Sequence, residues 1–419
     1  MIENGALIIT ISAFFGFFMA WAIGSNDVAN AMGISVGAGV LSLRQAIVVA
    51  AIFEALGSVL ASGNVTSTIS HGIINVEVLN NHPTLLINGM LSALLSSGVW
   101  LLVASIRGWP VSTTHTIIGA VFGFGWVCVG LGNINWGSLL TILASWIVTP
   151  VFSGLISYFL FKFVQKTIFE HDKPARQAKK TVPYYVFIVV AIMLSVVFFA
   201  SIDALGLVFT RTESLSYIFI ISFVCALISY FILREIALHR ARISLKESYA
   251  LVERVFGLLA IVTACAMAFA HGSNDVANAI APLAAISAIV NSGGTMISGI
   301  AIPHWIFFLG AFGIVSGLVM YGYKVIATIG NNITELTPSR GFVAQLSTAS
   351  IVVVASGLGI PVSTTHILVG SVLGVGMARG IDAINVGVVK KIFLSWFITF
   401  PVGMFLSVVF FHIISIFIN

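Results

Sequence analysis

Long apolar stretches with hardly any charged residue run along the whole sequence, and they limit the possible folds more than any other feature. A helix that crosses the hydrocarbon core of a bilayer needs about 20 mainly apolar residues. Seven stretches of suitable length are uninterrupted: Ala46–Ser62, Leu85–Ile106, Leu139–Phe161, Tyr185–Leu207, Leu215–Leu233, Ile302–Tyr323 and Ile392–Ile418. Residues 6–41, 109–133, 255–290 and 343–378 are also apolar, but Gly, Pro or polar residues interrupt them.

The charge content places these stretches in a membrane. Charged residues make up only 8% of the chain, whereas soluble proteins carry about 25%. So few charged residues could not cover the surface of a soluble protein of this size. Residues 343–378 are long enough for two crossings that meet at Pro361. The sequence therefore predicts an all-α polytopic membrane protein with about twelve crossings, and the lipid bilayer is its first partner.

Basic residues predict the orientation. They gather in residues 162–180 and 234–254, the second of which includes Arg240 and Arg242, and short basic loops stay in the cytoplasm. We therefore attribute the net charge of +5 to topology and expect no binding of nucleic acid. Counting crossings outward from these loops puts both termini outside the cell, in a multi-pass protein of the inner (cytoplasmic) membrane. The first basic residue is Arg44, so we expect no signal peptide in residues 1–40.

An internal repeat organises the chain. Three segments recur in the same order: Gly24–Ala31 as Gly272–Ala279, Pro110–His115 as Pro361–His366, and Ser145-Trp146 as Ser395-Trp396. We therefore expect two repeats, residues 1–165 and 250–419, joined by a two-crossing spacer at 166–249. The crossing count gives the repeats opposite directions in the membrane. Inverted repeats with discontinuous helices are typical of secondary transporters.

The Gly-Ser-Asn-Asp segments each carry a carboxylate into an apolar stretch, where a charge is costly. Asp27 and Asp275 are thus candidate ligands of a metal cation such as Na⁺, because Gly lets the helix unwind and expose backbone carbonyls beside them. The candidate cation-coupling residues are Asn26, Asp27, Asn30, Asn274, Asp275 and Asn278. A simpler interpretation is that each Asp caps a half-helix.

The two Pro-Val-Ser-Thr-Thr-His segments predict helix N-termini inside the membrane, because Ser and Thr favour the N-cap and Pro the first turn. Free N–H groups and the positive end of the helix dipole suit an oxyanion. The candidate anion-binding residues are Ser112, Thr113, Thr114, His115, Ser363, Thr364, Thr365 and His366, with Ser25 and Ser273. The two histidines either bind the anion or orient their neighbours.

Glu54 is a lone acid in the apolar stretch Ala46–Ser62. It is a candidate for coupling to a cation or a proton. A structural hydrogen-bonding role is the alternative, because the second repeat offers no matching acid.

With these residues in hand, the chain resembles the PiT family of inorganic phosphate transporters. The doubled Gly-Ser-Asn-Asp-Val-Ala-Asn-Ala and Pro-Val-Ser-Thr-Thr-His motifs carry the resemblance, and Phe-Glu-x-x-Gly-Ser at residues 53–58 supports it. The resemblance implies a symporter of inorganic phosphate driven by Na⁺ or H⁺, and in some bacterial members the carrier of a neutral metal–phosphate complex. A few members are thought to carry sulfate.

Other classes of protein fit less well. A channel needs a continuous polar pore, whereas the polar residues here gather in two mirrored places. The chain has no H-E-x-x-H, G-x-S-x-G or G-x-x-x-x-G-K-[ST] motif, which argues against an enzyme or an ATP-driven pump. We expect a secondary transporter with no cofactor beyond its coupling ion, and the sequence leaves a homo-oligomer open.

Overall fold

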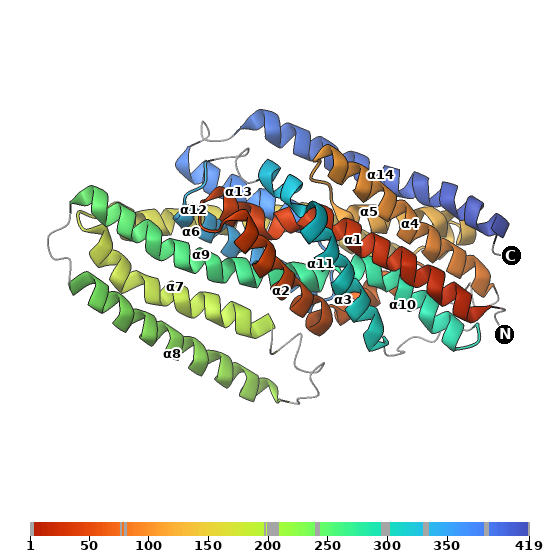
Figure 1. The fold of residues 1–419 in the computed structure, drawn as a ribbon, viewed down its shortest axis with the longest axis horizontal. Helices are drawn as coiled ribbons and strands as arrows, with labels where there is room; N and C mark the ends of the chain where they lie inside the picture. The colour runs from red at the N-terminus through yellow and green to blue at the C-terminus, as the bar shows by residue number, and fades with distance from the viewer. Residues whose placement is uncertain are drawn as a thin grey trace.

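The computed structural model describes residues 4–75, 78, 82–196, 198, 209–238, 244–294, 302–329, 335–380 and 385–417. Within these ranges the chain is almost wholly helical, with a single isolated β-bridge between Ile74 and Ile134. The helices form an elongated bundle (Figure 1). Arg240, Arg242 and the end of the expected crossing at Leu207 lie outside the described residues.

The helices follow the apolar stretches of the sequence. They are α1 (Gly5–Gly37), α2 (Leu43–Ala61), α3 (Gly63–His71), α4 (Pro83–Arg107), α5 (Thr113–Val129), α6 (Trp136–Val164), α7 (Pro174–Val196), α8 (Arg211–Leu238), α9 (Leu245–Asp275), α10 (Ala277–Asn291), α11 (His304–Ile329), α12 (Pro338–Gly357), α13 (Thr364–Arg379) and α14 (Val386–Phe417). Within the described residues, nine helical segments are long and apolar enough to cross a membrane. The prediction of an all-α polytopic membrane protein is confirmed.

The number of crossings stays a prediction. Helix α5 has 17 residues and α13 has 16, fewer than the roughly 20 that a full crossing needs. Helix α12 has 20 residues but contains several polar side chains in its N-terminal half. These helices begin or end at the two Pro-Val-Ser-Thr-Thr-His segments, so the discontinuities of the fold lie there.

Helices from the two ends of the chain are interleaved. Helix α1 packs against α11, α2 against α9, α5 against α14, and α13 against α6. Glycine makes two of these contacts possible, because a Cβ atom at Gly24 would collide with the carbonyl oxygen of Ile314, and one at Gly272 with that of Glu54. Small residues at such crossings let helix backbones touch within a membrane.

The same glycines correct one prediction. Helix α1 runs unbroken through Gly24 and Asp27, so the expected unwinding at the first Gly-Ser-Asn-Asp segment is wrong. In the second copy, helical structure pauses only at Val276, after the aspartate. Glycine serves close helix packing here, and the carboxylates project from intact helical turns.

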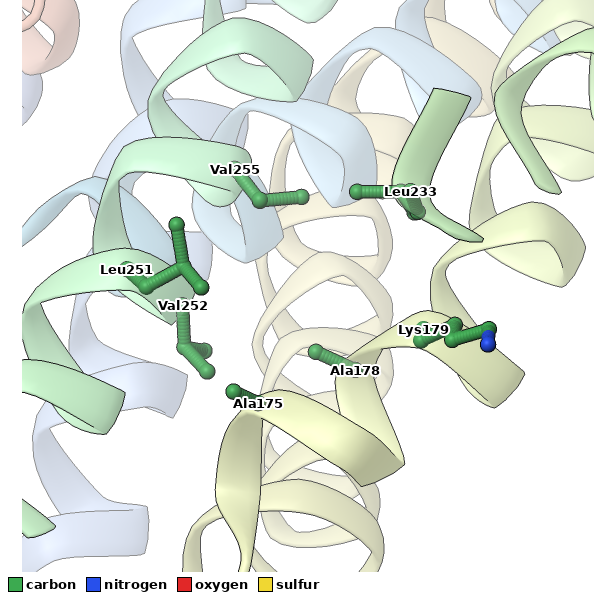
Figure 2. A pocket seen from close by; sticks show the side chains of 7 residues that line it. All are labelled: Ala175, Ala178, Lys179, Leu233, Leu251, Val252 and Val255. Atoms are coloured by element: carbon green, nitrogen blue, oxygen red, sulfur yellow. The ribbon is translucent and has the colours of Figure 1, made fainter. Parts of the chain in front are cut away.

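Helices α7 and α8 form a separate pair at one edge of the bundle (Figure 1). They pack on each other, and α7 also packs against α9. Where the three helices approach, a cavity of about 10 Å³ is lined by apolar side chains and Lys179, whose amine points away from the others (Figure 2). Such a volume holds about one water molecule, so the functional site is elsewhere.

Candidate functional site

Two helices begin deep inside the bundle, as the sequence predicts. Helix α5 starts after Ser112, whose Oγ accepts a hydrogen bond from the backbone N–H of His115 (3.1 Å). Helix α13 starts after Ser363, whose Oγ accepts one from His366 (3.4 Å). All four residues are buried. The other backbone N–H groups of each first turn have no partner within their own helix, which makes both starts suitable for an anion.

The two helix starts are in direct contact. The Thr114 hydroxyl on α5 donates to the carbonyl oxygen of Val362, just before α13 (2.9 Å). The Thr365 hydroxyl on α13 approaches the carbonyl oxygen of Val111, just before α5 (3.5 Å). Segments that are far apart in the sequence therefore form one central site.

Asparagines from the Gly-Ser-Asn-Asp-Val-Ala-Asn-Ala segments join this site crosswise. Asn30 on α1 donates to the hydroxyls of Thr365 (2.8 Å) and Thr364 (3.3 Å). Asn278 on α10 lies 3.3 Å from the hydroxyls of both Thr113 and Thr114. Each amide thus contacts the threonine pair of the opposite repeat, so one cluster contains both kinds of motif.

Asp275 carries the densest set of contacts in this cluster. Its Oδ2 accepts a hydrogen bond from Thr364 (2.8 Å) and lies 3.0 Å from Nε2 of His271. The other ring nitrogen of His271, Nδ1, is 3.2 Å from Oε1 of Glu54. Glu54, His271 and Asp275 are all fully buried. Glu54 is therefore connected to the central site by its contact with His271.

His271 is a site residue that the sequence-based analysis missed. It precedes Gly272, and the first repeat has Ile23 at the matching position. A polar residue one helical turn before a buried aspartate was the available signal, since residues four apart share a helix face. Its partnership with Glu54 could not be inferred, because α2 and α9 meet only in the folded chain.

Asp27 is equally buried but has almost no partners. Neither of its oxygens accepts a hydrogen bond of ordinary geometry, although the Thr113 hydroxyl lies beside it. One oxygen of Asp27, one ring nitrogen of His271 and one oxygen of Asp275 lie within 4.8 Å of one another. Buried charges are normally paired or bind metal ions, so Asp27 is available for a cation.

Within the described residues, His271 is the one basic side chain that contacts these acids. Among the residues that the structure describes, the buried acidic side chains are Asp27, Glu54 and Asp275, and no Lys or Arg is buried. Arg107, the basic residue nearest the first Pro-Val-Ser-Thr-Thr-His segment, lies over the Trp109 ring at 4.9 Å. The site thus combines three buried carboxylates, one histidine, neutral hydroxyl groups and two helix N-termini.

The remaining candidate residues hold the helices in place. Asn26 donates to Ser105 (3.2 Å) and to the carbonyl of Trp109 (3.1 Å) near the end of α4. Asn274 contacts Ser356 near the end of α12 (3.1 Å). Ser25 and Ser273 donate to carbonyls of their own helices, those of Trp21 and Ala270, both at 2.8 Å. These four side chains surround the cluster without contacting its threonine hydroxyls.

His115 and His366 form a column of rings. His115 stacks on Trp146 (3.6 Å between ring centres) and His366 on Trp396 (3.5 Å), while the two histidines meet edge to face at 4.3 Å. Nδ1 of His115 lies 3.4 Å from the carbonyl of Trp396, and Nδ1 of His366 lies 3.3 Å from that of Trp146. Since a carbonyl only accepts, each Nδ1 carries the proton, and the rings link the two Pro-Val-Ser-Thr-Thr-His segments.

A large cavity borders this column of rings. It has a volume of about 800 Å³ and is lined by apolar side chains of α6, α13 and α14, together with His115 and His366. Two lining residues, Trp146 and Trp396, have indole N–H groups without a hydrogen-bond partner. The candidate anion-binding threonines do not line this cavity.

A polytopic helical bundle with a buried, mirrored cluster of carboxylates and helix N-termini defines the class of the molecule as a membrane transporter.

Comparisons with known proteins give the family. The model of the phosphate transporter family matches residues 23–407. A protein of Haemophilus influenzae named a phosphate permease is 46% identical over 100% of this chain and 99% of its own length. The inorganic phosphate transporter 2-1, chloroplastic, of Arabidopsis thaliana is 42% identical over 94% of this chain and 70% of its own length. The solved structure of a sodium-dependent phosphate transporter has a TM-score of 0.89 and 40% identity, covering 98% of this chain and 99% of its own. The chain belongs to the phosphate transporter family.

Proposed function

We propose that this protein is a sodium-coupled symporter that moves inorganic phosphate across the cytoplasmic membrane by alternating access. The observation that carries the proposal is the cluster of two helix N-termini and three buried carboxylates, where the described residues include no buried Lys or Arg and a single histidine, His271. Similarity to a sodium-dependent phosphate transporter supports Na⁺ as the coupling ion.

Phosphate binds between the first turns of α5 and α13. The hydroxyls of Thr113, Thr114, Thr364 and Thr365 already gather there through Asn30 and Asn278. Backbone N–H groups at the two helix starts contribute partial positive charge without a fixed cation. Neutral donors of this kind bind an oxyanion but also release it, which a transporter requires.

Sodium ions bind beside the phosphate, at Asp27 and Asp275. A multiply charged anion would be repelled by bare carboxylates at this depth, and even one uncompensated charge in a membrane is costly. Cations at both aspartates remove the repulsion and stabilise the anion. Since neither charge is stable there alone, cation and anion must move together.

The crosswise contacts support alternating access. The threonines of each repeat touch the asparagine of the other, and the histidine column joins the repeats on one side. If the repeats are inverted, rocking of one against the other exposes the shared site to each side in turn.

The arrangement of the chain ends supports the expected topology. Figure 1 shows the start of α1 and the end of α14 at one end of the long axis, with the α6–α7 connection, the end of α8 and the start of α9 at the other end. Maleimide labelling of intact cells should therefore modify Asn4→Cys, an exposed position outside, and leave Asp172→Cys, exposed in the basic cytoplasmic loop, unmodified. The reverse pattern would overturn the orientation.

Uptake into proteoliposomes tests the proposed activity. Radiolabelled phosphate should accumulate when an inward Na⁺ gradient is imposed at equal pH, and much less with a pH gradient alone. Excess sulfate should compete poorly. Uptake that survives a divalent-metal chelator shows free phosphate to be the substrate, whereas loss of uptake would point to a metal–phosphate complex. Accumulation driven only by the pH gradient would replace Na⁺ with H⁺ as the coupling ion.

A further inference from the structure

The two aspartates differ in the side chains behind them. On the Asp275 side, the backbone of Gly272 faces the carbonyl of Glu54, and His271 precedes that glycine. On the Asp27 side, Gly24 faces the carbonyl of Ile314 in the same manner, and Ile23 precedes it. The equivalent positions thus hold a histidine and a glutamate in one half of the site and two isoleucines in the other.

The imidazole changes which cations the site can bind. Na⁺ is a hard ion that prefers oxygen ligands, whereas imidazole favours borderline divalent ions such as Zn²⁺, Co²⁺ and Ni²⁺. Asp27, His271 and Asp275 each present one ligand atom, and these atoms lie within 4.8 Å of one another. Metal–ligand bonds of about 2.0–2.2 Å require only a small further approach of these atoms.

Two independent observations point to a metal ion in this position. Asp27 is 1% exposed, and both its carboxylate oxygens lack a hydrogen-bond partner. Nδ1 of His271 lies 3.2 Å from Oε1 of Glu54. In metal sites a carboxylate commonly accepts the second N–H of the ligating histidine, which fixes the ring so that the other nitrogen faces the metal.

We propose that Asp27, His271 and Asp275 bind one divalent transition-metal ion, with Glu54 orienting His271. The inference rests on the proposed cation site and adds to it the chemical class of a second occupant. One divalent ion carries the charge of two Na⁺ ions, so it satisfies both aspartates at once and competes with sodium.

Cobalt provides a probe that reports both affinity and ligand type. Purified wild-type protein, freed of metal with a chelator, should bind one equivalent of Co²⁺ and develop the visible absorption of a site with nitrogen and oxygen ligands. Raising the Na⁺ concentration should weaken the apparent affinity, because the two ions compete for the same carboxylates. The His304→Ala variant is the control for adventitious binding, since His304 is an exposed histidine at the start of α11.

Variants assign the ligands. His271→Ile, which copies the first repeat, should remove the visible band and weaken binding by more than about 100-fold, beyond the effect expected of an orienting residue. Glu54→Gln should weaken binding by about 10–100-fold while keeping the band. His304→Ala should match the wild type. Unchanged binding in His271→Ile, or equal loss in His304→Ala, would overturn the proposal.

One measurement does not depend on how the variants fold. X-ray absorption of the Zn²⁺-loaded wild type should show scattering from a single imidazole, and a shell without imidazole would contradict the site. Sodium-driven phosphate uptake by metal-free protein from the same purification separates this inference from the transport function. Uptake without stoichiometric metal binding rejects the metal site alone, whereas metal binding without uptake leaves the site and rejects the symporter.

Discussion

The segments around Asp27 and Asp275 have the same eight-residue sequence but different chemical surroundings. Asp275 contacts His271 and Thr364, and His271 in turn contacts Glu54. On the Asp27 side the equivalent positions hold Ile23 and Ile314, and Asp27 has only the Thr113 hydroxyl beside it. Both aspartates lie at the same central cluster and near the same kinds of hydroxyl and amide groups. A repeated motif therefore fixes the position of a carboxylate. The side chains on neighbouring helices determine which groups compensate its charge.

The difference divides the site into shared and unshared parts. The threonines, asparagines and aspartates occur in both halves, so we assign them the common task of holding the phosphate and its cations. The histidine and the glutamate occur in one half only and cannot serve a symmetric task. The predictions below test this division.

The largest effect is expected from removing the carboxylate charge. Asp27→Asn and Asp275→Asn should each lower Na⁺-driven phosphate uptake by about 100-fold or more, the size expected when a buried charge pair worth about 3–5 kcal/mol is lost. Radiolabelled uptake into proteoliposomes measures the loss, with protein incorporation as the control. Full uptake by either variant would rule out that aspartate as a cation site.

The same two variants should differ in stability. Asp275→Asn removes one of the two carboxylates that contact His271. This loss should lower the free energy of unfolding by about 3–5 kcal/mol. Asp27→Asn loses no contact with a histidine and no hydrogen bond of ordinary geometry, and it should leave stability unchanged or raise it. Unfolding in detergent, compared at equal Na⁺ concentration, measures both. Equal destabilisation would mean that the surroundings of the two aspartates are energetically alike.

Converting one half of the site into the other sharpens the comparison. His271→Ile alone leaves Glu54 buried beside an apolar side chain and should cost about 3–5 kcal/mol. Adding Glu54→Ile, as at Ile314, should recover most of this loss, because replacing a buried ion pair by apolar residues is often neutral. A double-mutant cycle on unfolding measures the coupling. Additive losses would show that the two side chains do not act as a pair.

Close backbone contact at the two glycines should have a smaller effect on stability. Gly24→Ala and Gly272→Ala push a methyl group against the carbonyls of Ile314 and Glu54, and such overpacking costs about 1–3 kcal/mol. Gly63→Ala is the matched control, because no atom lies within 4 Å of a Cβ placed there. Thermal unfolding ranks the three variants, and similar midpoints would contradict the tight helix crossings.

The smallest effect is expected from single hydroxyls. Thr113→Val and Thr364→Val should raise the KM for phosphate by about 10-fold each, the value of one hydrogen bond to a charged group. The effect at Thr364 should be the larger, because the variant also removes the hydrogen bond that its single O–H donates to Asp275 in this structure. Thr141→Val on the exposed face of α6 should leave KM unchanged. A KM that stays at the wild-type value in both site variants would move the phosphate elsewhere.

Local chemistry explains which parts of the site were predictable. The helix starts at Ser112 and Ser363 followed from proline and hydroxyl residues that act within one turn. The role assigned to Gly24 was wrong because a glycine has two uses, unwinding a helix or admitting a neighbouring backbone, and only the packed structure distinguishes them. The backbone that approaches Gly24 is that of Ile314, and the local sequence does not reveal this contact.

Long-range partnerships explain what was missed. His271 acquires its role from Glu54, a residue on a distant helix, and a single sequence contains no signal of that contact. The sequence marks Glu54 as a lone acid in an apolar stretch, but it does not show that the partner of this acid is His271. The expected count of twelve crossings and the boundaries of the repeats stay predictions.

Equilibrium phosphate binding to the purified protein tests the central claim most directly, namely that anion and cations stabilise each other in one buried site. Phosphate affinity should be titrated with Na⁺ at fixed pH and ionic strength, and with pH at fixed Na⁺. We predict that affinity rises steeply with Na⁺ and is nearly lost when Na⁺ is replaced by choline, because the carboxylates then repel the anion. An affinity indifferent to both Na⁺ and pH would contradict the account.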